Sequence, residues 1–304
     1  MWRRASSPTP NDLHAVWGSG ESDVFAVGAG GTVVHFEGRG WNVQPSETAR
    51  TLRAVWGTGP QDIHAVGDGA TFMRYDGARW TRQAFAVPRP DDPINVYGVW
   101  GNDGRRLVAV GGPRSFVFVN DGGDWQMTYQ DAGPLDRSAL WGRGDTLYEI
   151  STNGSASRIA RGTIAGTTLP SFANTAQDVW CASQTPGCTQ TTGSSQPLLA
   201  LWGRDAMNII AVGGQGTIVQ KTSAAASFMA RTSGTTAALR ALWGIGADVW
   251  TVGDGGTIQR SLDGGGTWQA EESGTTQPLR GVWGTSTENV LAVGDDGIIL
   301  RYSR

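Results

Sequence analysis

Arginine, histidine, tyrosine and aspartate recur at two places in the sequence, and together these side chains could bind a polar ligand. The first place is the second position of runs such as LRAVWG, which carries His14, Arg53, Tyr97, Arg240 and Arg280. The second is a glycine-rich segment 14 or 15 residues after three of these arginines, which carries Asp68, Asp254 and Asp295. Arginine can bind a carboxylate or a phosphate through two parallel hydrogen bonds. The alternative is a solvated rim of charges that pair with one another.

Seven tryptophans that each precede a glycine form a second candidate group, because tryptophan faces can stack on sugars or aromatic ligands. They are Trp17, Trp56, Trp100, Trp141, Trp202, Trp243 and Trp283. Alternate residues of a strand share a face, so Leu52, Ala54 and Trp56 are expected on one face, and Arg53 and Val55 on the other. A tryptophan beside leucine and alanine is expected to act as a wedge between neighbouring units, with sugar stacking as the alternative.

The Trp-Gly pairs mark an internal repeat that must position both groups. Successive pairs lie 39 to 44 residues apart, except for one gap of 61, so the 304 residues contain seven units. Each unit consists of short β-branched and apolar runs between turns rich in Gly, Asp and Asn. Four strands per unit predict an all-β, seven-bladed β-propeller with four-stranded antiparallel blades, in one domain over 1–304. The first strand would line a central channel and place the polar residues near its mouth.

The two ends of the chain are expected to close this ring. The last unit stops after its third strand, GIILRYSR, and Trp2 precedes Trp17 by the same 15 residues that separate Trp41 from Trp56. The segment MWRRASS is therefore predicted to be the outer strand of the seventh blade. No apolar signal core is present, and no apolar run approaches the roughly 20 residues of a membrane span. A removed signal segment would leave no trace, so its absence says little about location.

The fourth unit departs from the others. It has an insertion at about 163–193, and its second run places Glu149 and Ser151 where other units have alanine and glycine. Long loops on regular scaffolds often carry function, so the insertion is either a lid or partner-contact loop, or a surface decoration. Cys181 and Cys188, seven residues apart, are expected to form a small disulfide loop, with two unrelated thiols as the alternative. The disulfide would indicate an oxidising compartment.

The sixth unit contains a motif that resembles a known repeat. SLDGGGTW, residues 261–268, matches the Asp-box S-x-D-G-x-x-x-W of bacterial neuraminidase (BNR) repeats and sortilin-like propellers. The run AVGDDGIILRYS is similar to propellers of the photosystem II assembly factor type. The resemblance covers nearly the whole chain and implies the propeller fold, but such propellers include enzymes, receptors, assembly factors and lectins. Asp263 is expected to accept backbone N–H bonds within its own turn, with Trp268 packed beneath it.

Charge and missing motifs narrow the function further. A net charge of −3 provides no basic field for nucleic acid. The three histidines and two cysteines form no metal-ligand cluster, and no phosphate-cradling loop or GxSxG nucleophile motif is present. A neuraminidase-like site would use Tyr97 with the three arginines, but the expected Tyr/Glu pairing is missing.

We therefore expect a non-catalytic recognition module, without cofactor or metal, that binds a protein or glycan at the channel-mouth face. Its setting would be extracellular or in the cell envelope of a bacterium. The first alternative is a multivalent lectin whose seven tryptophans hold sugars between blades. The second is a glycoside-acting enzyme. The sequence leaves the oligomeric state open.

Overall fold

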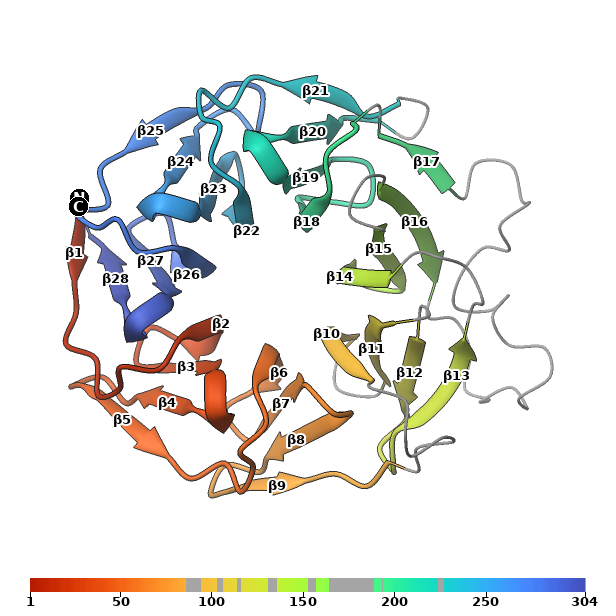
Figure 1. Ribbon diagram of the computed structural model, residues 1–304, viewed down its shortest axis with the longest axis vertical. Helices are drawn as coiled ribbons and strands as arrows, with labels where there is room; N and C mark the ends of the chain where they lie inside the picture. The colour runs from red at the N-terminus through yellow and green to blue at the C-terminus, as the bar shows by residue number, and fades with distance from the viewer. Residues whose placement is uncertain are drawn as a thin grey trace.

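The chain folds into a ring of seven blades around a central channel (Figure 1). The computed structural model describes residues 1–85, 94–102, 106–113, 116–130, 136–152, 157–163, 189–192, 194–223 and 227–303. In this part of the chain every blade is a four-stranded antiparallel sheet, with its first strand nearest the channel. The predicted seven-bladed, all-β architecture is confirmed. No helix among the described residues is long and apolar enough to cross a membrane.

The first four blades are numbered in chain order, and their strands run from the channel outward. Blade 1 contains β2 (Leu13–Gly20), β3 (Asp23–Gly28), β4 (Val33–Phe36) and β5 (Trp41–Gln44). Blade 2 contains β6 (Leu52–Gly59), β7 (Asp62–Gly67), β8 (Thr71–Tyr75) and β9 (Trp80–Arg82). Blade 3 contains β10 (Asn95–Asn102), β11 (Arg106–Gly112), β12 (Phe116–Asn120) and β13 (Gln126–Gln130). Blade 4 contains β14 (Asp136–Arg143), β15 (Thr146–Thr152), β16 (Ser157–Thr163) and β17 (Thr189–Thr191).

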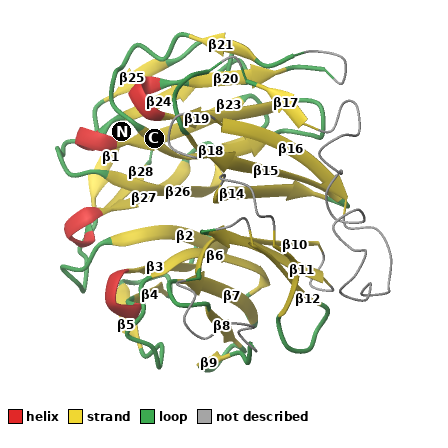
Figure 2. Ribbon diagram, turned by 45° about the vertical axis from the view of Figure 1, so that its right-hand side comes forward, coloured by secondary structure: helices red, strands yellow, loops and turns green. Residues whose placement is uncertain are grey.

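The last three blades follow the same plan. Blade 5 contains β18 (Leu198–Gly203), β19 (Ile209–Gly213), β20 (Ile218–Lys221) and β21 (Met229–Arg231). Blade 6 contains β22 (Leu239–Ile245), β23 (Asp248–Gly253), β24 (Ile258–Ser261) and β25 (Gln269–Glu271). Blade 7 contains β26 (Leu279–Ser286), β27 (Asn289–Gly294), β28 (Ile299–Tyr302) and β1 (Trp2–Arg4). Short 3-10 turns join second and third strands on one face of the ring (Figure 2): η1 (Ala29–Gly31), η2 (Gly214–Gly216), η3 (Asp254–Gly256) and η4 (Asp295–Gly297).

The N-terminal strand completes the last blade. β1 pairs antiparallel with β28, with Trp2 opposite Tyr302 and Arg4 opposite Leu300, and the two chain ends lie together in Figure 1. The indole Nε1 of Trp2 also donates to Glu271 Oε2 of blade 6 at 2.7 Å. The predicted ring closure by the first residues is confirmed.

The Trp-Gly pairs form a second closed ring inside the first. The tryptophans are half-buried, and each contacts the glycine of the next blade's pair. A methyl group in place of a glycine hydrogen would lie 2.8 Å from the Trp17 ring at Gly57 and 2.6 Å from the Trp283 ring at Gly18. Trp56, Trp100, Trp141, Trp202 and Trp243 make the same contact with Gly101, Gly142, Gly203, Gly244 and Gly284. A glycine follows each tryptophan because any side chain there would overlap the preceding blade's indole.

A β-bulge interrupts the first strand of every blade. In blade 2 the pairing with β7 shifts between Leu52 and Ala54, so Arg53 has no partner. The expected face assignment was therefore wrong. Leu52 and Val55 pack toward blade 1, whereas Ala54 and Trp56 pack toward blade 3. The extra residue reverses the alternation of the strand and turns Arg53 out of the ladder.

The turn that resembles an Asp-box is held by its own side chains. Asp263 Oδ1 accepts the backbone N–H of Thr267 at 2.9 Å and the Ser261 hydroxyl at 2.7 Å. These bonds lower the pKa of Asp263 to about 2. The indole Nε1 of Trp268 donates to Gly265 O at 3.0 Å. Both side chains therefore shape the hairpin, as expected from the sequence.

Candidate ligand site at the channel mouth

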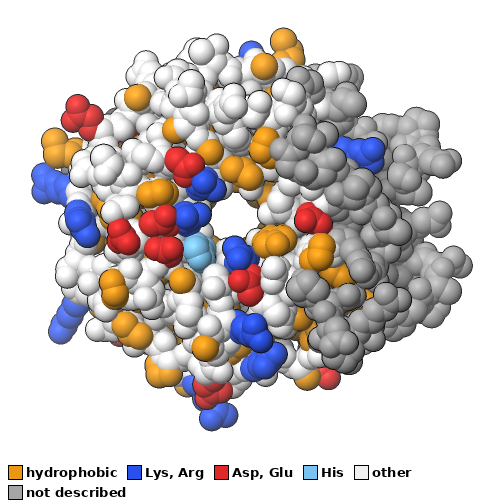
Figure 3. Space-filling model, in the orientation of Figure 1, with side chains coloured by type: hydrophobic (Ala, Val, Ile, Leu, Met, Phe, Trp, Pro, Cys, Tyr) orange, Lys and Arg blue, Asp and Glu red, His pale blue; other side chains and the backbone are white. Residues whose placement is uncertain are grey.

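The bulged position places one side chain per blade at one mouth of the channel. The shift recurs at the same place in all seven first strands. Five consecutive blades, in the order 6, 7, 1, 2 and 3, carry polar residues there: Arg240, Arg280, His14, Arg53 and Tyr97. Figure 3 shows the charged side chains and a histidine gathered along part of the opening. We call this set, together with Asp68, Asp254 and Asp295, the mouth arc.

Each arginine of the mouth arc pairs with the aspartate of its own blade. The Nη2 atom lies 3.0 Å from Oδ2 in the Arg53–Asp68 pair. The same distance is 2.8 Å in both the Arg240–Asp254 and the Arg280–Asp295 pair. In all three, the Nε atom bonds the other carboxylate oxygen.

These pairs limit how an arginine can meet a ligand. The guanidinium has five N–H groups, and the aspartate occupies the edge formed by Nε and Nη2. The remaining N–H groups, on Nη1 and the far side of Nη2, have no partner among the described residues, and each aspartate retains acceptor capacity. Arg53 also lies over the Tyr97 ring, with 5.5 Å between its Cζ and the ring centre. The mouth arc thus offers donors and acceptors in alternation, with nearly balanced charge.

His14 lies between two arginines and is half-buried. Burial, followed by the charges of Arg280 and Arg53, lowers the pKa of His14, while Asp12 and Asp295 oppose the shift. The hydrogen bonds that Arg280 donates to Asp295 raise the pKa of Arg280. His14 is therefore neutral at neutral pH and can donate through one ring nitrogen and accept through the other.

Blades 4 and 5 complete the mouth without charge at the bulged position. They place Ser138 and Leu199 there, and Ser138 Oγ donates to Ile150 O at 3.5 Å. In blade 4 the neighbouring Arg137 forms a buried ion pair with Glu149, whose Oε1 accepts the Ser151 hydroxyl at 3.3 Å. The unusual Glu149 and Ser151 of this blade thus belong to its interior, and the bulged position carries an arginine, histidine or tyrosine only in blades 6, 7, 1, 2 and 3.

The other predicted site residues lie elsewhere. Trp141 and Trp202 border a pocket of about 390 Å³ together with Arg143, Arg204 and Ile245. Cys181 and Cys188, with most of the insertion, lie outside the described residues. Within the part of the chain that the structure describes, no three His, Cys, Asp or Glu side chains are arranged to hold a metal ion.

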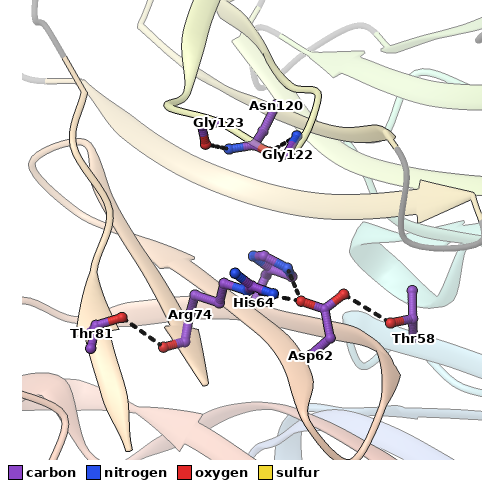
Figure 4. A network of polar contacts seen from close by, with 8 residues as sticks. All are labelled: Thr58, Asp62, His64, Arg74, Thr81, Asn120, Gly122 and Gly123. Atoms are coloured by element: carbon purple, nitrogen blue, oxygen red, sulfur yellow. Dashed lines mark hydrogen bonds and ion pairs between the residues drawn. The ribbon is translucent and has the colours of Figure 1, made fainter. Parts of the chain in front are cut away.

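Sequence reasoning missed a recurring contact between the second and third strands. The acidic residue that opens the second strand accepts from a basic residue 12 positions later, as in Asp23–His35 at 2.6 Å and Asp62–Arg74 at 2.9 Å. In Figure 4, Asp62 also receives a bond from His64 at 3.1 Å. That bond from His64, with smaller contributions from Thr58 and Arg74, holds the pKa of Asp62 well below its usual range. The signal was present in the sequence as the constant spacing of 12.

Comparison with known proteins adds to this geometry. No known protein family and no curated protein sequence matches the chain. Among solved structures, YCF48 bound to D1 peptide is similar with a TM-score of 0.75 and 16% identity, over 100% of this chain and 95% of that chain. The WD40 β-propeller domain of Doa1 is similar with a TM-score of 0.77 and 13% identity, over 100% and 97%.

An enzyme is among the similar structures as well. A catalytically inactive virginiamycin B lyase from Staphylococcus aureus with quinupristin has a TM-score of 0.76 and 12% identity, over 99% of this chain and 98% of that chain. At these identities the likeness establishes the seven-bladed propeller fold and leaves the function to the site.

Proposed function

We propose that the chain is a non-catalytic recognition module that binds an extended protein segment across the mouth arc. The observation that carries this proposal is the set of three Arg–Asp pairs, with His14 and Tyr97 between and beside them, on five consecutive blades. An extended peptide presents N–H donors and C=O acceptors in alternation. The balanced charge of the mouth arc suits such a backbone better than a phosphate or another strong anion. YCF48, a propeller of the same fold, has been solved with a peptide bound.

A peptide library displayed on phage provides the test. Peptides selected on the wild-type protein are measured by calorimetry against Arg53→Ala, Arg280→Ala and the control Arg82→Ala, an exposed arginine on the outer strand of blade 2. Hydrogen bonds to charged groups contribute about 1.5–3 kcal/mol. We therefore expect about a tenfold or greater loss of affinity for the two mouth variants and none for the control. Equal affinity for all three variants would place the ligand elsewhere.

A multivalent lectin is the second candidate. The pocket beside Trp141 and Trp202 supports it, because half-buried indoles border an opening there. A glycan array followed by calorimetry distinguishes the two candidates. Several sugars bound per chain would favour the lectin, and a stoichiometry near one, or no binding, would remove it.

A glycoside-acting enzyme is the third candidate, and the pairing of its arginines weakens it. A neuraminidase-like site needs arginines free to hold the substrate carboxylate, whereas Arg53, Arg240 and Arg280 each bind an aspartate. Turnover on a glycoside panel would restore this candidate. We also propose that the chain belongs to the Asp-box group of propellers. We further propose that the protein is secreted or lies in the cell envelope of a bacterium. Detection of the protein outside the cytoplasm would test the location.

A further inference from the structure

A pocket of about 290 Å³ lies between blades 7 and 1, among their second, third and outer strands. In Figure 1 these strands are β27, β28 and β1 on one side, and β4 and β5 on the other. The side chains that matter for its chemistry are Ala5, Phe36, Trp41, Asn289, Leu291 and Arg301. We call it the blade 7–1 pocket. It shares no lining residue with the mouth arc.

At the neighbouring interface, between blades 6 and 7, protein side chains occupy the place that corresponds to the blade 7–1 pocket. Arg260 of β24 forms ion pairs with Asp248 at 3.1 Å and with Glu271 at 3.4 Å. The Glu271 carboxylate also accepts the indole N–H of Trp2 at 2.7 Å. The Arg260 guanidinium lies 4.6 Å from the centre of the Trp250 ring, which is fully buried. Two carboxylates and two aromatic rings, those of Trp250 and Tyr302, thus surround this arginine.

The strand registers identify the corresponding residues one blade further on. Arg301 is the third residue of β28, as Arg260 is of β24. The backbone N–H of Ala5 bonds Ile299 O at 2.9 Å, which is the register that pairs Glu271 with Ile258. By the same alignment, Asp248, Glu271, Trp250, Tyr302 and Trp2 are replaced by Asn289, Ala5, Leu291, Phe36 and Trp41.

These replacements remove the two carboxylates and the buried tryptophan but keep the arginine, which is exposed at this interface. Arg301 Nε donates to the neutral Asn289 Oδ1 at 3.1 Å, and no carboxylate pairs with Arg301 among the described residues. Its guanidinium lies over Phe36, 6.0 Å from the ring centre. Leucine in place of the buried tryptophan leaves room for a ring, and alanine in place of Glu271 leaves room for a carboxylate. The two vacant groups are adjacent, because Trp250 and Glu271 both contact Arg260.

We propose that the blade 7–1 pocket binds an aromatic carboxylate. The ring of the ligand occupies the place that Trp250 fills at the neighbouring interface, between Leu291 and Phe36. The carboxylate takes the place of the Glu271 group and accepts from the Arg301 guanidinium and the Trp41 indole N–H, as charge-assisted bonds. The exposed Arg39 at the rim adds positive charge, while the Glu21 carboxylate accepts a bond from Thr285 at 3.3 Å. A free aromatic acid and the C-terminal aromatic residue of a protein share this chemistry.

Calorimetric titration with indole-3-acetate and indole-3-acetamide tests the pocket. The acid should bind at least about tenfold more tightly than the amide, because only the acid supplies a negative charge that can pair with the Arg301 guanidinium. Arg301→Gln should remove this preference, and Arg79→Gln, an exposed arginine in the β8–β9 hairpin, should leave it unchanged. Peptides ending in a free C-terminal tryptophan, compared with their C-terminal amides, separate the two sources. Tighter binding of the peptide acid indicates a protein terminus, and tighter binding of indole-3-acetate indicates a small acid.

A filling variant keeps the proposal falsifiable if Arg301→Gln does not fold. Ala5→Glu, Asn289→Asp and Leu291→Trp together rebuild the blade 6–7 arrangement at the blade 7–1 interface. This triple variant should fold with an unchanged or higher melting temperature and bind neither probe. The proposal is overturned if the triple variant binds the acid as the wild type does. It is equally overturned if neither acid binds the wild type at about 1 mM, or if acid and amide bind alike.

Discussion

The ring of tryptophan–glycine contacts predicts a specific energetic coupling between neighbouring blades. A methyl group at Gly101 would lie 2.9 Å from both Cη2 and Cζ3 of Trp56 and 2.6 Å from Leu107 Cδ2. Real Cβ atoms do not approach other heavy atoms so closely, so one side must move. Overpacking of this kind costs about 1–3 kcal/mol. We therefore expect Gly101→Ala to destabilise the fold by about 2 kcal/mol.

The melting temperature and the coupling follow from the same contact. An unfolding entropy of about 2.1 cal/mol/K per residue over 304 residues gives about 0.64 kcal/mol/K, so 2 kcal/mol lowers the melting temperature by about 3 °C. Trp56→Ala should cost about 2–3 kcal/mol, below the value for a fully buried tryptophan, because Trp56 is half-buried. Once the indole is gone, Gly101→Ala should lose about half of its cost, which corresponds to a coupling of about 1 kcal/mol.

Urea unfolding of the wild type, both single variants and the double variant measures this coupling. Gly59→Ala is the matched control, because its methyl group would meet no heavy atom within 4 Å. Its effect should add to that of Trp56→Ala within about 0.5 kcal/mol. If Gly101→Ala is also additive to that precision, the indole does not restrict the glycine and the wedge interpretation fails.

Two further predictions concern charged groups. Arg137→Ala should destabilise the fold by about 3–5 kcal/mol, because it leaves the Glu149 carboxylate buried without its cation. The double variant Arg137→Met with Glu149→Leu should recover most of this loss. Urea unfolding measures both effects. Burial lowers the pKa of His14, so the unfolded state takes up its proton first and stability should fall as pH drops below about 6.5. His14→Gln should remove that part of the slope, and an NMR titration midpoint at or above 6.5 would contradict the described electrostatics.

The fold could be predicted from the sequence because the same pattern recurs in each unit, so that an interpretation of one unit can be checked against the others. The Trp-Gly spacing gave the number of blades, and the offset between Trp2 and Trp17 gave the closing strand. Both inferences depend on features that recur, and the pairing of Trp2 with Tyr302 bears them out. The insertion before Thr189 breaks the repeat, and there the sequence provides no second copy to compare.

The face assignment failed because a bulge leaves no clear mark in composition. LRAVWG reads as an ordinary alternating strand, yet one unpaired residue at Arg53 reverses the side on which Ala54 and Trp56 lie. The same bulge explains why the variable position leaves the strand ladder. Sequence reasoning placed Arg53 and Asp68 at the same mouth, but only their geometry shows that the aspartate already occupies one edge of the guanidinium.

The mouth arc and the blade 7–1 pocket follow from one property of repeated folds. Every blade must bury the same inter-blade surfaces, so a departure at one interface can be judged against its neighbours. Arg260 shows that an arginine at this position is compatible with the fold when carboxylates and aromatic rings surround it. Arg301 keeps the position without a carboxylate partner among the described residues, and it bonds the neutral Asn289 and lies over the Phe36 ring. Unlike Arg260, Arg301 is exposed, so its charge is hydrated in the free protein and is accessible to a carboxylate that enters the blade 7–1 pocket.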